Sequence, residues 1–286
     1  RARLPPQGGR QGPMRPPGPL VARAAAALAA SAVAATGLLA AEALQARRRI
    51  GRRTSAPPYA DGRYGRGAGM TIRLAVLGDS GAAGLGADSP GDTMGAILAN
   101  ALAEVSGRTV TLSNHAVVGA QTNDLDAQID RAVWTRPHVA VVMIGANDIT
   151  HLVPRPLSAR RLRHAIRRLR EGGTEVVMAT CPDLGTVKPV PQPLRAIMRR
   201  RSRLLAQAQA AVTVAEGGRA VMLGSRLGPE FDERPDVMFA SDRFHPSTQG
   251  YEAAAQALLP EVIAAWRLGG EGELLPDVAT ADDVTG

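Results

Sequence analysis

Short apolar runs that alternate with longer helical segments constrain the fold of this chain more than any other feature. The apolar runs occupy residues 72–77, 110–118, 138–144, 175–180 and 219–223, and turn residues bound each of them. Helical segments lie at 92–105, 122–134, 158–170, 193–215 and 248–267. Continuous Val, Ile and Leu runs separated by such helices indicate βαβ units and a parallel sheet covered on both faces. We therefore expect an α/β fold, a flavodoxin-like three-layer α/β/α sandwich with a five-stranded parallel sheet.

This alternation covers residues 70–270, and the composition changes on both sides of it. Residues 1–23 are rich in Pro, Gly and Arg, and residues 47–69 are basic and rich in Pro and Gly. Neither segment has an apolar period, so we expect a disordered N-terminus and a linker. Residues 24–46 are hydrophobic and rich in Ala, so we expect a helix there, and residues 271–286 are an acidic tail that we expect to be disordered. One domain of ordinary size is therefore predicted over 70–270.

The uncharged run from Ala24 to Ala41 is long enough to bear on whether the protein associates with a membrane. Its 18 residues span about 27 Å as a helix, close to the ~30 Å core of a bilayer. Arg15 and Arg23 precede it, which is also typical of an export signal. The five arginines that follow it favour a cytoplasmic domain by the positive-inside rule; they are Arg47, Arg48, Arg49, Arg52 and Arg53. A membrane anchor, an export signal and a helix lying beside the domain remain alternatives, and we expect a membrane-associated or envelope protein with the side left open.

The net charge of +8 arises mainly from the N-terminal 69 residues, and the predicted domain contributes only +3. Residues 1–69 hold 12 arginines against two carboxylates, and the tail holds five carboxylates and no base, so the domain is close to balance. Lys188 is the only lysine, and only eight aromatic residues are available to stack on bases. Nucleic acid is therefore not an expected partner. Cys181 is the only cysteine, which excludes an intrachain disulfide and a cysteine metal cluster.

The first apolar run leads into Gly78-Asp79-Ser80-Gly81, a tight turn that carries a serine. A parallel strand delivers the residues that follow it to the carboxyl edge of the sheet, where open α/β sheets bind ligands. A serine hydroxyl is a poor nucleophile without a base, an orienting group and oxyanion donors. Taken alone, this turn favours a serine that merely caps the next helix.

Residues elsewhere in the chain could complete a serine site. Asp242 and His245 stand three apart in a loop, so that the carboxylate can fix the imidazole tautomer while the other ring nitrogen faces the serine. Pro246 suits the first turn of the final helix. Gly119 follows the second strand and can offer an unobstructed N–H to an oxyanion, and Asn147 follows the third strand and can donate from its amide.

Competing types of site lack their motifs. The chain has no G-x-S-x-G elbow, no G-x-x-x-x-G-K-[ST] loop and no G-x-G-x-x-G after the first strand. No set of His, Asp and Glu has the spacing of a metal site. We therefore expect neither a cofactor nor a metal.

The stretches Ala116-Val117-Val118-Gly119-Ala120 and Thr180-Cys181-Pro182-Asp183-Leu184-Gly185 look like those of actinobacterial members of the SGNH (GDSL-type) hydrolase family of esterases and lipases. Four blocks of the sequence together resemble this family. They are Gly78-Asp79-Ser80, Gly119, Gly145-Ala146-Asn147-Asp148 and Asp242-x-x-His245-Pro246, in this order at successive strand ends and loops. Gly81 stands at the fourth position of the GDSL motif, a departure that is common in the family. The resemblance implies that Ser80 is the nucleophile, His245 the base and Asp242 its orienting acid. It also implies an oxyanion hole of the Ser80 and Gly119 N–H groups and the Asn147 side chain.

The function expected from this resemblance is a serine esterase that hydrolyses small-molecule or lipid carboxylic esters through an acyl-enzyme on Ser80. Thioester hydrolysis or acyl transfer to a lipid or glycan at the same site is one alternative, and a non-catalytic flavodoxin-like binding domain is another. The loops at 150–157, 181–193 and 224–241 are the candidates for the walls of the acyl pocket. Acyl chain length, the alcohol part and the oligomeric state are left open by the sequence.

Overall fold

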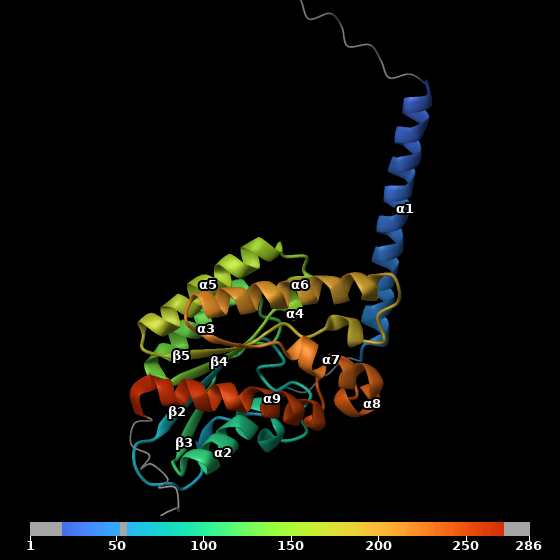
Figure 1. Cartoon of the computed structure of the whole chain (residues 1–286). Helices are drawn as coiled ribbons and strands as arrows, with labels where there is room; N and C mark the ends of the chain where they lie inside the picture. The colour runs from blue at the N-terminus through green and yellow to red at the C-terminus, as the bar shows by residue number, and fades with distance from the viewer. Residues whose placement is uncertain (1–18, 52–55, 272–286) are drawn as a thin grey trace, which may run out of the picture.

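A computed structural model of the protein describes residues 19–51 and 56–271. It shows a layered body from which one long helix projects (Figure 1). Three predictions fall wholly or partly outside the described residues: the disorder of the first residues of the chain, the disorder of the acidic tail, and the last part of the arginine cluster at Arg52 and Arg53.

In the described part of the chain, six strands form one sheet in the order β1-β3-β2-β4-β5-β6. The strands are β1 (Gly62–Tyr64), β2 (Ile72–Gly78), β3 (Val110–Asn114), β4 (Val139–Met143), β5 (Glu175–Ala179) and β6 (Arg219–Val221). All neighbours from β3 to β6 pair in parallel, and β1 pairs antiparallel with β3. The parallel strands follow the doubly wound order of flavodoxin-like folds. The predicted five-stranded parallel sheet is confirmed, with β1 added at its edge.

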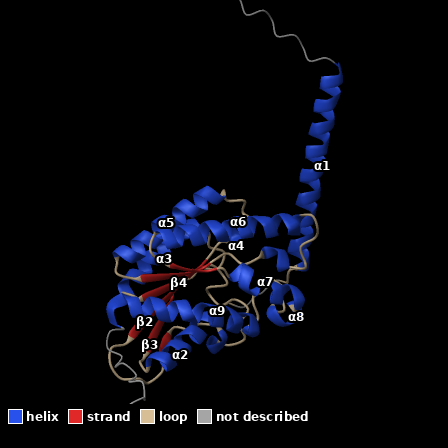
Figure 2. Ribbon diagram, in the orientation of Figure 1, coloured by secondary structure: helices blue, strands red, loops and turns tan. Residues whose placement is uncertain are grey.

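Helices cover both faces of this sheet (Figures 1 and 2). On one face lie α3 (Leu125–Ala132), α5 (Arg155–Glu171) and α6 (Leu194–Ala215), and on the other lie α2 (Met94–Ser106) and α9 (Thr248–Trp266). Leu74 and Val76 of β2 pack in the core beneath α2 and α9, whereas Ala75 and Leu77 pack in the core beneath α3 and α5. Because successive residues of one strand enter opposite cores, the strands read as continuous apolar runs.

Shorter elements fill the connections. They include α4 (Ala146–Thr150) after β4, and α7 (Leu223–Glu233) and α8 (Pro235–Met238) after β6. The remaining turns are η1 (Pro90–Asp92), η2 (Thr122–Asp124), η3 (Val133–Thr135), η4 (Leu184–Thr186) and η5 (Arg267–Glu271). The sequence did not predict α7, because its glycines and Pro229 weaken the helical pattern.

The segment predicted to be a linker, 47–69, contributes a strand to the sheet. Besides the pairing of β1 with β3, the N–H of Asn114 donates to Asp61 at 2.8 Å and the Thr109 hydroxyl donates to the carbonyl of Gly67 at 3.0 Å. The latter part of this segment is therefore integrated into the folded body. A three-residue edge strand of Gly, Arg and Tyr is too short to show an alternation, so no local pattern predicts it.

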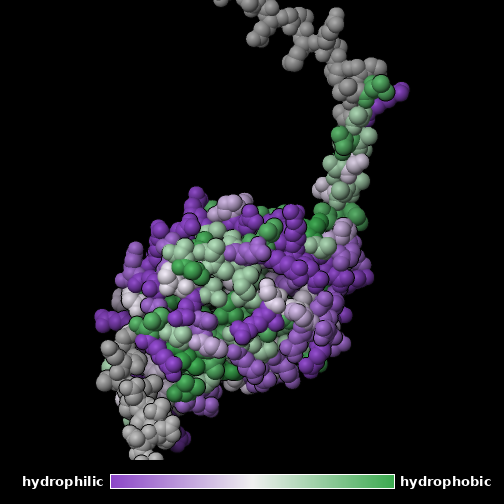
Figure 3. Space-filling view, in the orientation of Figure 1, coloured by the Kyte–Doolittle hydropathy of each residue, from purple (hydrophilic) through white to green (hydrophobic). Residues whose placement is uncertain are grey.

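The N-terminal helix α1 (Pro19–Arg49) stands away from the body along most of its length (Figures 1 and 3). By length and composition, the stretch Ala26–Arg49 could cross a membrane, and only 6% of its most apolar window is buried. Leu28 and Val33 are each 73% exposed. Only the carboxyl end of the helix meets the body, where Glu42 and Ala46 are buried.

Candidate active site

The serine turn is fixed at the carboxyl end of β2 by its backbone. Gly78 has φ of +142°, and a Cβ there would lie 1.8 Å from the carbonyl oxygen of Met143, so only glycine fits. The buried amide of Gln128 accepts from the Gly78 N–H at 2.7 Å and donates to the Gly78 carbonyl at 2.8 Å. The Asp79 N–H donates to Met143 at 3.1 Å. Ser80 therefore leaves the sheet in a turn that is held from α3 and from β4.

Ser80, His245 and Asp242 form a continuous hydrogen-bonded relay. The Ser80 Oγ lies 2.9 Å from Nε2 of His245, and Nδ1 of His245 lies 2.7 Å from Oδ2 of Asp242. An Nδ1–H that donates to the carboxylate leaves Nε2 to accept from the serine hydroxyl. The structure thus brings together all three residues predicted for the nucleophile, the base and the orienting acid.

The carboxylate of Asp242 is held in its charged form. Its side chain is only 2% exposed, and burial alone would raise its pKa. Hydrogen bonds from the His245 ring and from the backbone N–H groups of His245 and Phe244 outweigh burial and hold the pKa of Asp242 below its usual value. A permanent negative charge beside Nδ1 favours an imidazolium when His245 takes a proton.

The loop that carries His245 is set by a tight turn and not by the final helix. The Arg243 N–H donates to the Ala240 carbonyl at 2.8 Å, which closes the turn, and the Ala240 N–H donates to the His245 carbonyl at 2.8 Å. The expectation that Pro246 occupies the first turn of α9 is wrong, since the helix begins at Thr248. Ser247 caps this helix, because its hydroxyl oxygen accepts a hydrogen bond from the otherwise unpaired N–H of Gly250.

The two predicted oxyanion residues beyond Ser80 lie on connected segments. Asn147, in the first turn of α4, donates from its amide to the carbonyl of Ala120 at 2.9 Å. This bond tethers the loop in which Gly119 adopts φ of +85°. The same loop is joined to the serine turn, because the Val117 N–H donates to the Gly78 carbonyl at 3.1 Å.

Sequence reasoning missed two buried carboxyl groups around the site. Asp79 is 5% exposed and accepts from the Gly81 N–H at 3.1 Å, and burial raises its pKa to about 6. Asp148 is fully buried and accepts from the Ser158 hydroxyl at 2.8 Å and from the N–H of Thr122 at 3.2 Å, which anchors the turn of Asn147. Aspartates at strand ends are ordinary turn residues, so nothing in the sequence alone marks these two as buried.

An apolar cavity of about 100 Å³ lies beside Ser80 and His245. Residues from β4, from the loop after β5 and from α7 line it; they include Met143, Leu184, Val187, Leu223, Leu227 and Phe231. Two of the three predicted wall loops, 181–193 and 224–241, contribute to this lining, and the third, 150–157, does not. The cavity can therefore take a hydrophobic group next to the serine.

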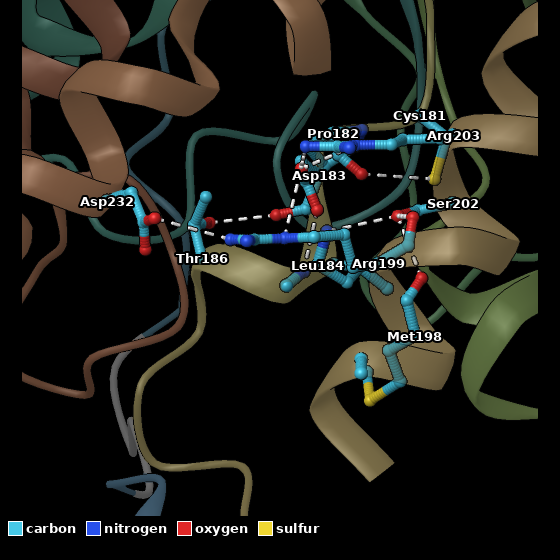
Figure 4. A network of polar contacts seen from close by, with 12 residues as sticks. Cys181, Pro182, Asp183, Leu184, Thr186, Met198, Arg199, Ser202, Arg203 and Asp232 are labelled. Carbon is cyan, nitrogen blue, oxygen red and sulfur yellow. Dashed lines mark hydrogen bonds and ion pairs between the residues drawn. The ribbon is translucent and has the colours of Figure 1, made fainter. Parts of the chain in front are cut away.

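A polar network fixes one wall of this cavity (Figure 4). Oδ2 of Asp183 accepts from Nε of Arg203 at 3.1 Å and pairs with Nε of Arg199 at 3.4 Å, while Oδ1 accepts from the Gly185 N–H at 2.8 Å. Arg199 also reaches Asp232 of α7 at 3.5 Å. The loop after β5 is thereby tied to both α6 and α7.

A flavodoxin-like sandwich with a Ser–His–Asp relay at the carboxyl edge of its sheet and an apolar cavity beside the serine defines a hydrolase of the SGNH type. In the described ranges, no three His, Cys, Asp or Glu side chains gather as metal ligands would. The chain belongs to the GDSL-like lipase/acylhydrolase family, whose sequence profile matches residues 76–253. It is accordingly an ester-hydrolysing enzyme, as the resemblance of its four blocks predicted.

Individual proteins agree with this assignment. The chain is 43% identical over 233 residues to the GDSL-like esterase Rv1075c of Mycobacterium tuberculosis. The aligned region covers 77% of this chain and 74% of that protein. Among solved structures, the acetyl-xylooligosaccharide esterase Axe2 of Geobacillus stearothermophilus matches with a TM-score of 0.52 and 20% identity, over 69% of this chain and 95% of that one. A lipase/acylhydrolase of Enterococcus faecalis matches with a TM-score of 0.53 and 20% identity, over 68% and 96%. These structures share the fold.

Proposed function

We propose that this enzyme is a serine carboxylesterase that hydrolyses its substrates through an acyl-enzyme on Ser80. The observation that carries the proposal is the unbroken relay from the Ser80 hydroxyl through His245 to Asp242, with distances of 2.9 and 2.7 Å. A serine that merely caps a helix has no reason to meet an imidazole whose other nitrogen is held by a buried carboxylate.

The reaction proceeds in two steps. The Ser80 Oγ attacks the ester carbonyl carbon while Nε2 of His245 takes the hydroxyl proton, and Asp242 stabilises the imidazolium that forms. His245 then gives that proton to the departing alcohol oxygen as the carbon–oxygen bond breaks. In the second step, His245 removes a proton from the water that attacks the acyl carbon. His245 then returns this proton to the Ser80 Oγ as the bond between the acyl carbon and Oγ breaks, which releases the carboxylic acid.

The N–H groups of Ser80 and Gly119 and the side chain of Asn147 are the donors we propose for the oxyanion. The contact of Asn147 with Ala120 supports this, because a primary amide carries two hydrogens and this contact uses one of them. The same contact orients the amide before substrate binds. Such preorganised donors stabilise the tetrahedral intermediate without reorganisation during the reaction.

The apolar cavity supports a substrate with a hydrophobic acyl group. Leu223, Leu227 and Phe231 are among its largely apolar walls, and the carboxylate of Asp183 in the lining is already paired with Arg199 and Arg203. Esters of aliphatic acids, including lipid esters, are therefore the proposed substrates. The exposed apolar length of α1 further supports association of the enzyme with a membrane, the arrangement that would bring such esters close.

Covalent labelling tests the proposal. A fluorophosphonate probe should label the full chain on Ser80, and Ser80→Ala and His245→Ala should each abolish both labelling and hydrolysis of p-nitrophenyl esters. Circular dichroism and thermal unfolding of both variants control for loss of the fold. Labelling or turnover that persists in folded Ser80→Ala would place the nucleophile elsewhere.

A further inference from the structure

The end of the projecting helix touches the loop that carries Asp242 and His245. We name residues 42–51 the docking segment and residues 239–246 the catalytic loop. The Gly51 N–H donates to the carbonyl of Asp242 at 3.0 Å. Nη2 of Arg243 donates to the carbonyl of Arg49 at 2.8 Å. Two hydrogen bonds therefore join the docking segment to Asp242 and to its neighbour in the chain.

Apolar contacts reinforce this junction. Ala46 is 6% exposed and clusters with Val187 and Phe239, and Ile50 packs against the same cluster. Phe239 and Val187 also line the cavity beside Ser80. The docking segment thus supports, from outside, residues whose other side faces the site.

A buried carboxylate holds the other end of the docking segment. Glu42 is 5% exposed and accepts from the Leu194 N–H at 2.9 Å, at the start of α6. Helix N-termini present unpaired N–H groups, and a carboxylate there is stabilised by both hydrogen bonding and the helix dipole. The segment is therefore fixed at both ends, at α6 and at the catalytic loop.

The catalytic loop has a conformation that needs support. Arg243, directly after Asp242, adopts φ of +59°, a left-handed conformation that is unfavourable for an arginine. Such a conformation persists only where surrounding contacts impose it. One of these contacts is the hydrogen bond from the Arg243 guanidinium to Arg49.

The approach of Gly51 to Asp242 leaves no room for a side chain. A Cβ at position 51 would lie 2.9 Å from the Cα of Asp242 and 3.4 Å from its Cβ. The obstructing atoms belong to the backbone and first carbon of Asp242, so they cannot move without moving the carboxylate.

We infer that the docking segment is a positioning element for Asp242, so that the N-terminal helix is part of the catalytic unit as well as a membrane-facing segment. This inference rests on the proposed function, in which Asp242 orients His245. The docking segment thus has two roles. It sets the geometry of the catalytic acid, and it attaches α1 to the folded body.

Gly51→Ala in the full chain, assayed in detergent, tests the inference. A displacement of Asp242 by roughly half an ångström would restore ordinary contact with the new Cβ. A misplacement of 1 Å lowers the rate of an enzyme by about 100-fold, so we expect kcat to fall about tenfold while KM stays within about threefold. Fluorophosphonate labelling should slow in parallel. Gly37→Ala is the matched control. Gly37 lies in α1, outside the docking segment, and no atom lies within 4 Å of the position that its Cβ would take.

A double-mutant cycle separates positioning from general damage. If Gly51→Ala acts through the Asp242 carboxylate, it should add less than about twofold to the loss in an Asp242→Asn background. Arg243→Ala removes an exposed side chain and should also lower kcat. This variant replaces Gly51→Ala in the test if Gly51→Ala folds poorly. Wild-type kcat in both variants, or full additivity with Asp242→Asn, would overturn the inference. An inactive wild-type chain would instead refute the proposed function.

Discussion

Replacing Asp79 by Asn is expected to stabilise the protein at neutral pH and much less at acidic pH. Burial raises the pKa of this carboxyl group from 3.8 to about 6. Each pKa unit corresponds to about 1.36 kcal/mol, so ionised Asp79 lowers the free energy of unfolding by about 3 kcal/mol. Asparagine keeps the acceptor for the Gly81 N–H and carries no charge.

The pH window follows from the sign of this shift. Because the pKa is higher in the folded state, the folded protein binds more protons than the unfolded chain between about pH 4 and 6, and its stability falls as the pH rises through that window. The contribution of protonated Asp79 is fully present below pH 3.8 and is lost above about pH 6. Between pH 4 and 8 the difference between Asp79→Asn and wild type should grow by roughly 2.5 kcal/mol.

Thermal or urea unfolding of both proteins at constant ionic strength measures this difference. All other groups titrate in both proteins, so the pH dependence of the difference isolates Asp79. For a domain of this size, 2.5 kcal/mol corresponds to a relative gain of roughly 5 to 10 °C in Tm at pH 8. A difference that stays constant with pH, or that grows towards acidic pH, would show that burial does not raise the pKa of Asp79.

Three further predictions concern the site and the helix. Asn147→Ala should lower kcat by about 10² to 10³ with KM within a few-fold in p-nitrophenyl ester kinetics, and a loss under about fivefold would return Asn147 to a purely structural role. Leu227→Trp should fill the cavity and lower kcat/KM for an octanoate ester at least about tenfold relative to the acetate ester, and an unchanged ratio would mean that the acyl chain lies elsewhere. The full chain should sediment with membranes until detergent releases it, and recovery in the aqueous fraction without detergent would contradict anchoring by α1.

The sheet and the relay could be predicted because local sequence carries them. Strands buried on both faces, such as 72–77 and 139–143, are apolar at every position, and the helices between them show a clear period. Ser80 and the Asp242-x-x-His245 pair stand at the turns and loops where such a fold presents side chains to ligands. Their convergence follows from the topology of a parallel sheet.

The rest depends on contacts between distant segments. The burial that raises the pKa of Asp79 comes from packing that no local pattern describes. Strand β1 exists because β3 offers an unpaired edge, and Gly51 is required only because the Asp242 backbone lies against it. Helix α7 folds in spite of Pro229 and its glycines, against the packing surfaces of α6 and α9. In each case tertiary context overrides weak local preference.

The hydrogen bond between Ser80 and His245 joins residues 165 positions apart, which sets when the enzyme can first act during its synthesis. At about 5 to 20 residues per second, roughly ten to thirty seconds separate translation of the serine from translation of its base. Over that interval α1 has already emerged and can reach a membrane, while the nucleophile has no partner. The membrane association proposed for α1 can therefore be established before the growing chain is able to cleave an ester.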